Sequence, residues 1–293
     1  MRLKVFIVSL VCMLCFGICY PLGWITMHEK ADRMSAAAAK KIAEKVNSPD
    51  EWYIYGLSAL NEYKEGEAQS AFDKVLAFEP NSVEAKWGTA EIKRRKHDTE
   101  AGISMLEDII KVSPQFAPAY ISLAYIDFND KKYDEAVNLS AHVIAQGKDN
   151  VDVNNYARAH LIFAGAKGMI AHNGGPIVKI LHGTQVFPHL AQAQKLLPQS
   201  AEVYFGLGAY YLLAPGLVGG DLEKAREHLQ KAITLDPKLA DAYVRLGQVY
   251  KAKGNEAKYQ YYLKKALEID PKNALANDIQ SKKCDFICIN SDK

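Results

Sequence analysis

Proline recurs at a fixed interval in two parts of this chain. An interval of 34 residues separates Pro80 from Pro114, and the same interval separates Pro237 from Pro271. Three small residues follow the same period: Gly56, Ala90 and Ala124. Because proline cannot continue a helix, each of these prolines marks a helix end. The period predicts paired helices stacked in a row, since one helix pair cannot bury its apolar face alone.

The composition is that of an ordinary folded protein. Hydrophobic residues make up 49% of the 293 residues and charged residues 24%, which favours neither a disordered chain nor a protein that crosses a membrane many times. The formal net charge is +2, and Arg2 and Lys4 account for all of it, because the remaining 34 basic residues equal the 34 acidic ones in number. This balance gives no reason to expect nucleic acid as a partner.

Residues 1–27 contain an apolar leader. A short basic start followed by an apolar run is typical of a signal peptide or of an uncleaved signal anchor. Gly17 and Cys19 would suit cleavage before Tyr20, whereas an apolar stretch that continues to Met27 would approach the ~20 residues that span a bilayer. Lipid attachment at Cys15 or Cys19 is a third alternative. Both main interpretations predict an exported protein, periplasmic or anchored facing the outside, that contacts the membrane only through this segment.

Aromatic and small residues recur between the prolines. The last unit contains Tyr243, Leu246, Gly247, Tyr250, Ala266 and Pro271. The unit before it has Tyr204, Leu207, Gly208, Tyr211, Ala225 and Pro237 in the same order, with five extra residues in its middle turn. The first unit has Trp52, Gly56, Ala68, Phe72 and Pro80. This pattern resembles the tetratricopeptide repeat family. The resemblance implies an all-α fold: a right-handed solenoid of about six helix pairs with a capping helix at its C-terminus.

The units divide the rest of the chain into consecutive segments. These are a linker with a short helix (28–48), units one to three (49–148), an enlarged atypical unit four (149–200), units five and six (201–272), and a capping helix with a tail (273–293). In unit four we expect helices over 155–172 and 187–197, because Gly183 and Pro188 argue against a continuous second helix. The apolar stretch between these helices, residues 177–181, could be helix, strand or a loop that touches a membrane.

The resemblance also implies where a partner binds. The concave face of such a superhelix is lined mainly by the first helix of each unit. The residues expected on that face are Tyr53, Asn61, Trp87, Arg94, Arg95, Tyr125, Phe128, Asn129, Phe205 and Gln248. Aromatic rings, amides and two arginines suit a peptide, a protein terminus or an apolar ligand with a charged end. The alternative is that several of these rings only pack between repeats.

A basic run, Lys-Arg-Arg-Lys-His, occupies residues 93–97 at the end of a predicted first helix. Positive charge there complements the helix dipole, so the run could be a solvated turn. If it binds a ligand, Arg94 and Arg95 would capture a carboxylate or a phosphate.

Glycine and proline cluster in residues 214–221, just before a predicted helix. We expect Asp221 to cap that helix, because the Gly-Lys-Ser/Thr signature of a phosphate-binding loop is absent. Residues 219–225 are similar to a motif in the periplasmic T-component of tripartite ATP-independent (TRAP) transporters, a helical repeat protein that partners a solute-binding protein. This similarity implies a transport accessory as an alternative function.

Histidine and cysteine give no clear metal site. Four histidines lie close together in the sequence, at His160, His172, His182 and His189, without the spacing of metal ligands, and we expect them to be scattered and exposed. Cys284 and Cys288 could form a disulfide or remain free thiols. We therefore expect neither a metal nor a cofactor.

No set of catalytic residues can be assigned, so we expect a non-enzymatic protein. The leading hypothesis is an interaction scaffold of the cell envelope whose concave groove binds an extended or helical segment of a partner protein. The alternative is a periplasmic ligand-binding protein or transporter accessory that encloses a small apolar ligand. An open groove would favour the first hypothesis, and a groove plugged by residues 173–186 would favour the second.

Overall fold

A computed structural model describes residues 23–283 and 287. This part of the chain is helical throughout, which confirms the predicted all-α class. The helices are α1 (Trp24–Ala31), α2 (Ala36–Val46), α3 (Pro49–Asn61), α4 (Glu65–Phe78), α5 (Val83–Arg95), α6 (Thr99–Val112), α7 (Ala117–Asn129), α8 (Tyr133–Gln146), α9 (Val153–Asn173), α10 (Pro176–Leu196), α11 (Ala201–Leu213), η1 (Gly216–Val218), α12 (Leu222–Leu235), α13 (Ala240–Ala252), α14 (Glu256–Ile269) and α15 (Ala274–Gln280).

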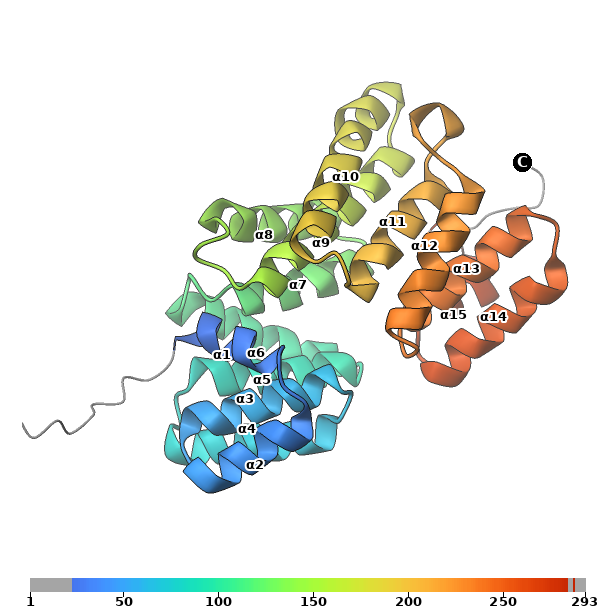
Figure 1. The fold of residues 1–293 in the computed structure, drawn as a ribbon. Helices are drawn as coiled ribbons and strands as arrows, with labels where there is room; N and C mark the ends of the chain where they lie inside the picture. The colour runs from blue at the N-terminus through green and yellow to red at the C-terminus, as the bar shows by residue number, and fades with distance from the viewer. Residues whose placement is uncertain (1–22, 284–286, 288–293) are drawn as a thin grey trace, which may run out of the picture.

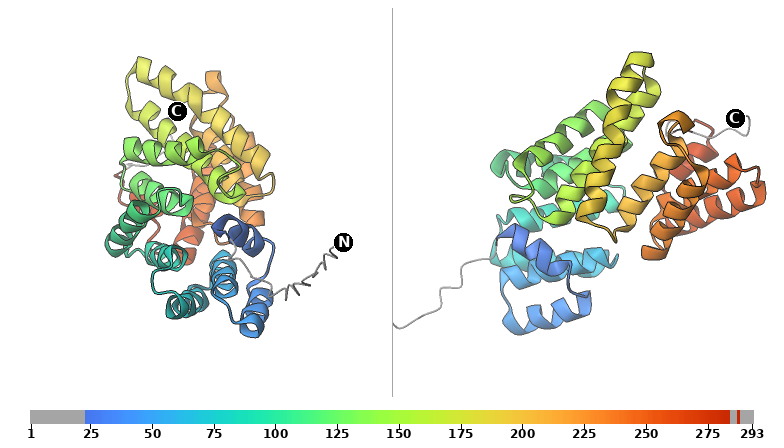
Figure 2. Two further views of the ribbon diagram at one scale, coloured as in Figure 1. Left: turned by 90° about the vertical axis from the view of Figure 1, so that its left-hand side faces the viewer. Right: turned by 45° about the horizontal axis from the view of Figure 1, so that its top comes forward.

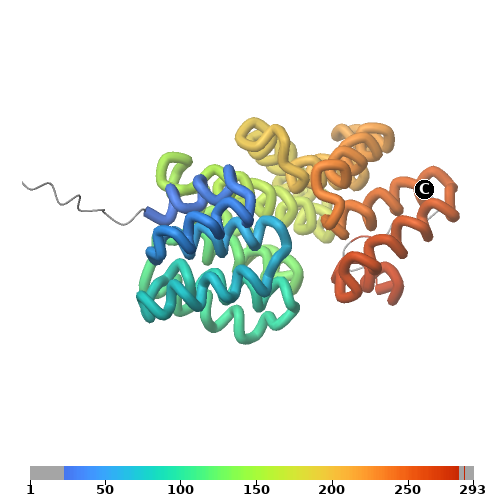
Figure 3. Tube along the Cα trace, turned by 60° about the horizontal axis from the view of Figure 1, so that its bottom comes forward, coloured from blue at the N-terminus to red at the C-terminus, as the bar shows by residue number. Residues whose placement is uncertain are grey.

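Helices α3 to α14 form six pairs that stack into a solenoid, and α15 covers the last pair (Figure 1). Helices α1–α8 form one arm and α11–α15 form a second arm, with α9 and α10 between them (Figure 3). We call these the N-terminal arm and the C-terminal arm. Helices α9 and α10 are the longest in the described part and project beyond their neighbours (Figure 2).

Small residues set how closely the helices of adjacent units approach. The ring of Phe72 on α4 lies between Gly56 on α3 and Gly88 on α5. A Cβ atom built on either glycine would lie only 2.4 Å from a ring carbon of Phe72. The recurrent small residues therefore make room for the aromatic side chain between two first helices, as the sequence pattern indicates.

The turn inside a unit has the same geometry in four units. The second residue after the first helix lies in the left-handed region, with φ of 58° at Tyr63, 61° at His97, 65° at Lys131 and 73° at Gly254. The N–H of the next residue closes the turn by donating to a carbonyl five residues back, at 2.8–2.9 Å. Only one of the four residues is glycine, so the helix packing on both sides imposes this conformation on the others.

The N-terminal boundary differs from the prediction. Trp24, Met27, His28 and Ala31 recur at helical spacing and put one face of α1 against the N-terminal arm, where Met27 and Ala31 are buried. Residues 24–31 therefore form a helix that packs on the repeat units. Helix α2 matches the short helix expected after the leader, and Ser35 caps it. The rest of the leader and the two tail cysteines lie outside the described residues.

Unit four also differs from the prediction. Residues 176–196 form one continuous helix, α10, with Pro188 inside it. Helix α10 packs along α9, and Gly183 sits opposite Ala171 where the two helices approach. This packing outweighs the helix-breaking tendency of proline, which is about 3 kcal/mol. Residues 177–181 are thus the first turns of α10. Within residues 23–283, no helix has the length and apolar character needed to span a membrane.

Candidate functional site: the groove between the arms

The two arms touch at their edges. The hydroxyl of Tyr63 in the first unit donates to the carboxylate of Asp236, which precedes α13. One unit further on, Nε2 of His97 lies 3.3 Å from Oδ1 of Asp270, which precedes α15. Both contacts join residues that are 173 positions apart in the sequence. Phe128 at the end of α7 also packs against the core of the last unit, so the arms enclose the space between them.

The enclosed space is a groove of about 2930 Å³. Its walls are formed mainly by α5, α7, α9, α10 and α11, with parts of α1, α3 and the turns of the C-terminal arm at its margins. Pockets for small molecules usually measure about 300–1,000 Å³. Residues 179–187 of α10 belong to one wall and do not plug the groove. Eight of the ten residues predicted for the concave face line it: Asn61, Trp87, Arg94, Arg95, Tyr125, Phe128, Asn129 and Phe205.

Helix α1 covers the first part of the concave face. Nε2 of His28 lies 3.0 Å from the hydroxyl of Tyr53, and its ring centroid lies 5.4 Å from that of Trp87. Tyr53 is consequently 1% exposed and Trp87 6% exposed. The prediction that these two rings face a partner is therefore wrong for Tyr53 and leaves little of Trp87 accessible, because the chain's own N-terminal helix packs on both.

The basic run of α5 is tied to a buried carboxylate. Arg94 donates to both oxygens of Glu91 at 2.8 and 2.6 Å, and Nε of Arg95 donates to the same carboxylate at 3.0 Å. Ser122 on α7 donates to it as well, at 3.0 Å. Burial alone would raise the pKa of Glu91, but the two guanidinium groups exceed that effect and hold the pKa well below its usual range. Glu91 therefore partly neutralises the positive charge of Arg94 and Arg95 in the absence of a ligand.

Beyond this carboxylate, Arg94 and its neighbours form an aromatic and polar surface. The guanidinium carbon of Arg94 lies 4.5 Å from the centroid of the Tyr125 ring. Tyr125 is 38% exposed and its side chain is hydrogen-bonded with that of Asn129. Helix α11, the first helix of unit five, adds Phe205, which packs against the core of units five and six and lines the groove.

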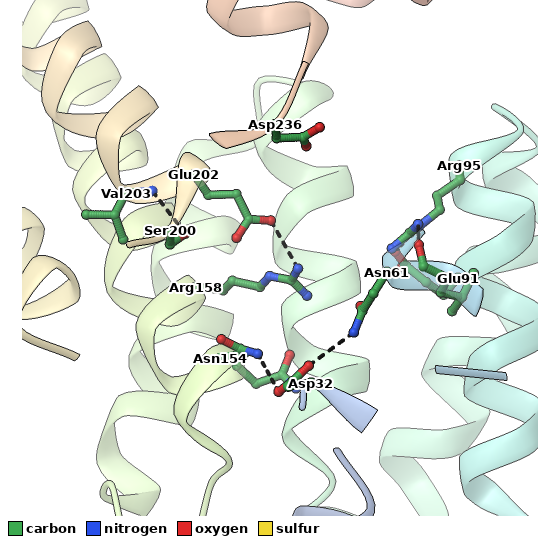
Figure 4. A network of polar contacts seen from close by, with 12 residues as sticks. Asp32, Asn61, Glu91, Arg95, Asn154, Arg158, Ser200, Glu202, Val203 and Asp236 are labelled. Atoms are coloured by element: carbon green, nitrogen blue, oxygen red, sulfur yellow. Dashed lines mark hydrogen bonds and ion pairs between the residues drawn. The ribbon is translucent and has the colours of Figure 1, made fainter. Parts of the chain in front are cut away.

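A second charged pair lies across the groove from Arg95 (Figure 4). Nη2 of Arg158 on α9 donates to Oε1 of Glu202 on α11 at 3.0 Å, and this guanidinium lowers the pKa of Glu202. Below the pair, Asp32 at the end of α1 accepts from Asn61 at 3.2 Å and from Asn154 at 2.5 Å. Burial raises the pKa of the Asp32 carboxyl.

Gln248 lies deeper in the C-terminal arm than predicted. It is 1% exposed, and its amide oxygen accepts from Arg245 at 2.7 Å. Burial lowers the pKa of Arg245 to about 10. Both side chains also donate to the main-chain carbonyl of Ile287, at 3.0 Å from Gln248 and 3.3 Å from Arg245.

Comparisons with known proteins identify the repeats. Two family models, described as TPR repeat and tetratricopeptide repeat, match residues 219–254 and 240–273. Residues 219–273 are therefore tetratricopeptide repeats, and the stacked helix pairs of the described residues have the same fold. The similarity of residues 219–225 to a transporter component stays a prediction.

Two curated proteins match along most of the chain. The Protein CTR9 homolog of Arabidopsis thaliana is 24% identical over 223 residues, which is 74% of this chain and 19% of that protein. Tetratricopeptide repeat protein 6 of Homo sapiens is 26% identical over 220 residues, 73% of this chain and 37% of that protein. The chain thus spans only 19% and 37% of the lengths of these relatives.

Solved structures share the tetratricopeptide fold at low identity. The structure of the APC/C hetero-tetramer Cut9–Hcn1 superposes with a TM-score of 0.60 at 14% identity, over 85% of this chain and 46% of the other. A tetratricopeptide repeat protein from Parabacteroides merdae gives a TM-score of 0.52 at 13% identity, over 87% and 96% of the two chains. These likenesses show the fold alone.

The histidines of unit four depart from the expected scattered and exposed arrangement. Nδ1 of His160 on α9 lies 2.9 Å from Nδ1 of His189 on α10, and the His189 ring stacks on Phe163 with centroids 4.2 Å apart. Burial and the neighbouring His189 lower the pKa of His160 to about 4. His160 and His189 lie on different helices, so their contact depends on the packing of α10 against α9. Residues 23–283 contain no cluster of three or more His, Cys, Asp or Glu side chains suited to a metal ion.

The sequence did not reveal the charged pair of units four and five. Arg158 and Glu202 are 44 residues apart, and unit four breaks the 34-residue period, so no repeat position assigns Arg158 to the concave face. Glu202 lies two residues after the N-cap Ser200, and an acidic residue is common in the first turn of any helix. A usable signal is the lack of any acidic residue between 153 and 201, because Glu202 is then the first carboxylate that follows Arg158 in the sequence.

Proposed function

We propose that this chain is a non-enzymatic scaffold that binds a segment of another protein in the groove between its arms. The observation that carries the proposal is the size of the groove, about 2930 Å³. This is roughly three times the upper end of the usual range for small-molecule pockets. A polypeptide segment fits such a space, and tetratricopeptide repeats are generally interaction scaffolds. The alternative of a chamber for a small apolar ligand is less well supported.

The chemistry of the walls supports a polypeptide partner with mixed side chains. Tyr125 and Phe205 offer aromatic surface, and Asn61 and Asn129 offer amides to a main chain. Positive and negative groups alternate along the walls as ion pairs, so the groove presents no single sign of charge. Such a surface binds through shape, aromatic contacts and hydrogen bonds more than through net charge.

We further propose that the protein works in the cell envelope. This rests on the basic start and the apolar run at the N-terminus of the sequence. Fractionation of the native host, with protein N-terminal sequencing, tests it. Recovery in the cytoplasmic fraction would contradict the proposed location and leave the groove proposal untouched.

Photo-crosslinking from two tyrosine positions tests the groove. A benzophenone amino acid replaces Tyr125, which is 38% exposed on the groove wall, or Tyr261, which is 55% exposed on α14 outside it. After irradiation of the native host, crosslinked polypeptides are identified by mass spectrometry. We expect one recurring protein at position 125 and not at position 261.

Two outcomes would contradict the proposal. Equal crosslinking at both positions would show that the groove has no special role. A small molecule that co-purifies with the protein, with no polypeptide crosslinked at position 125, would favour the ligand-binding alternative.

A further inference from the structure

One residue of the C-terminal tail lies in the groove at the boundary of the two arms. Ile287 lines the groove, and its side chain packs against a cluster on α8 and α9 made of Tyr133, Val137, Ala166 and Met169. Its carbonyl oxygen faces the opposite arm, where it accepts from Gln248 and Arg245. Ile287 therefore bridges the N-terminal arm, unit four and the C-terminal arm.

The two donors are built into the wall of the last unit. Gln248 is 1% exposed and Arg245 is 6% exposed. Nη1 of Arg245 donates to Oε1 of Gln248 at 2.7 Å. This hydrogen bond fixes the Gln248 amide so that its N–H points at the Ile287 carbonyl. A buried donor without an acceptor is costly, so the Gln248 amide requires an acceptor in the groove. A main-chain carbonyl is the acceptor that any peptide supplies.

Ile287 adopts an unfavourable backbone conformation while it makes these contacts. Its φ is 66°, in the left-handed region that β-branched residues avoid. The contacts to the groove must offset that strain. A segment that makes the same contacts in a relaxed conformation would bind better than the tail does.

We infer that Gln248, Arg245 and the apolar cluster on α8 and α9 form a peptide subsite, and that Ile287 of this chain is its resident, displaceable occupant. The subsite takes a peptide residue with a branched apolar side chain, and the two donors hold the carbonyl of that residue. This inference rests on the proposed groove function and names the class of segment that the groove selects. Ile287 competes with any partner because it is covalently joined to the chain that forms the subsite.

A labelled peptide tests the subsite in the full chain. The peptide has the sequence of residues 281–293 with serine at both cysteine positions, and its binding is followed by fluorescence anisotropy. In the wild-type protein the tethered tail competes at an effective concentration in the millimolar range, so the peptide should bind weakly. In Ile287→Asp the tail no longer fits, and we expect the Kd of the peptide to fall at least tenfold.

Two controls separate the subsite from unspecific binding. In the first control the peptide itself carries Asp at position 287, and this peptide should not bind the Ile287→Asp protein. This control does not depend on the folding of a further protein variant. Gln248→Leu added to Ile287→Asp should weaken peptide binding at least tenfold while circular dichroism remains helical.

Equal binding of the peptide to wild type and Ile287→Asp, or no binding to either, would overturn the inference. So would equal binding of the two peptides. If the tail inference fails in this way while position 125 still crosslinks a partner, the scaffold function stands and only the assignment of this subsite falls.

Discussion

At the scale of single residues, a contact between two histidines joins the two helices of unit four. His160 and His189 approach each other through their Nδ1 atoms, so one ring donates and the other accepts, which requires at least one neutral imidazole. Burial and His189 keep the pKa of His160 near 4, below its value of about 6.5 in an unfolded chain. The unfolded state therefore binds more protons than the native state between these two pH values, and stability falls as the pH is lowered through that window.

We predict that His160→Gln reduces this pH dependence. Between pH 7 and pH 5 the wild-type protein should lose about 1–2 kcal/mol of unfolding free energy through His160, because a single depressed histidine loses up to about 1.4 kcal/mol per pH unit. Urea unfolding followed by circular dichroism at the two pH values measures the loss. If wild type and His160→Gln lose the same free energy, the pair does not control the acid stability of unit four.

At the scale of helices, the positions of the small residues decide how first helices stack. The Phe72 ring occupies the space that Gly56 and Gly88 leave open, so the glycine and the aromatic ring of this pattern are one packing unit. Added volume at a close contact of this kind forces side chains or backbone to shift.

We predict that Gly88→Ala destabilises the protein by about 1–3 kcal/mol despite the higher helix propensity of alanine. Gly66→Ala is the matched control, because a Cβ at Gly66 meets no atom within 4 Å, and it should be neutral or slightly stabilising. Phe72→Leu combined with Gly88→Ala should cost less than the two single changes together. Additive losses in thermal unfolding would show that the ring does not cause the effect.

The sequence predicted these paired helices because their spacing is set by side chains that recur along the chain. It failed where local and tertiary preferences conflict. Pro188 argued for a break in α10, but packing on α9 keeps that helix continuous. The apolar face of α1 was taken as part of the leader, since composition does not distinguish a face that packs on Tyr53 from one that enters lipid. Most of the groove residues were found, whereas Arg158 was missed because unit four has no period to locate it.

At the scale of the whole molecule, the contacts between the arms determine the shape of the groove. Tyr63 lies between cations of both arms: Arg95 lies 6.0 Å and Lys238 4.9 Å from its ring centroid. The His97–Asp270 contact is partly exposed, and exposed ion pairs contribute about 1 kcal/mol or less. These contacts therefore influence the distance between the arms more than the stability of the fold.

We predict that the double variant Tyr63→Phe/His97→Ala widens the distribution of distances between the arms. Spin labels at the exposed positions Glu100 and Lys264, measured by double electron–electron resonance, should report a broader and longer distribution, while the melting temperature changes little. Tyr261→Phe/His142→Ala makes the same chemical changes away from the contact and should leave the distribution as in wild type. An unchanged distribution in the first variant would mean that the arms are held by Phe128 and the core instead.

Both contacts between the arms span 173 residues, and this shared separation limits how the protein can evolve. An open solenoid can gain or lose a unit anywhere, because each unit touches only its neighbours. Here an insertion or deletion of one unit between the arms would move both Asp236 and Asp270 away from their partners at once. The number of repeats is thus fixed by the need of the two ends to meet, as it is in a closed ring.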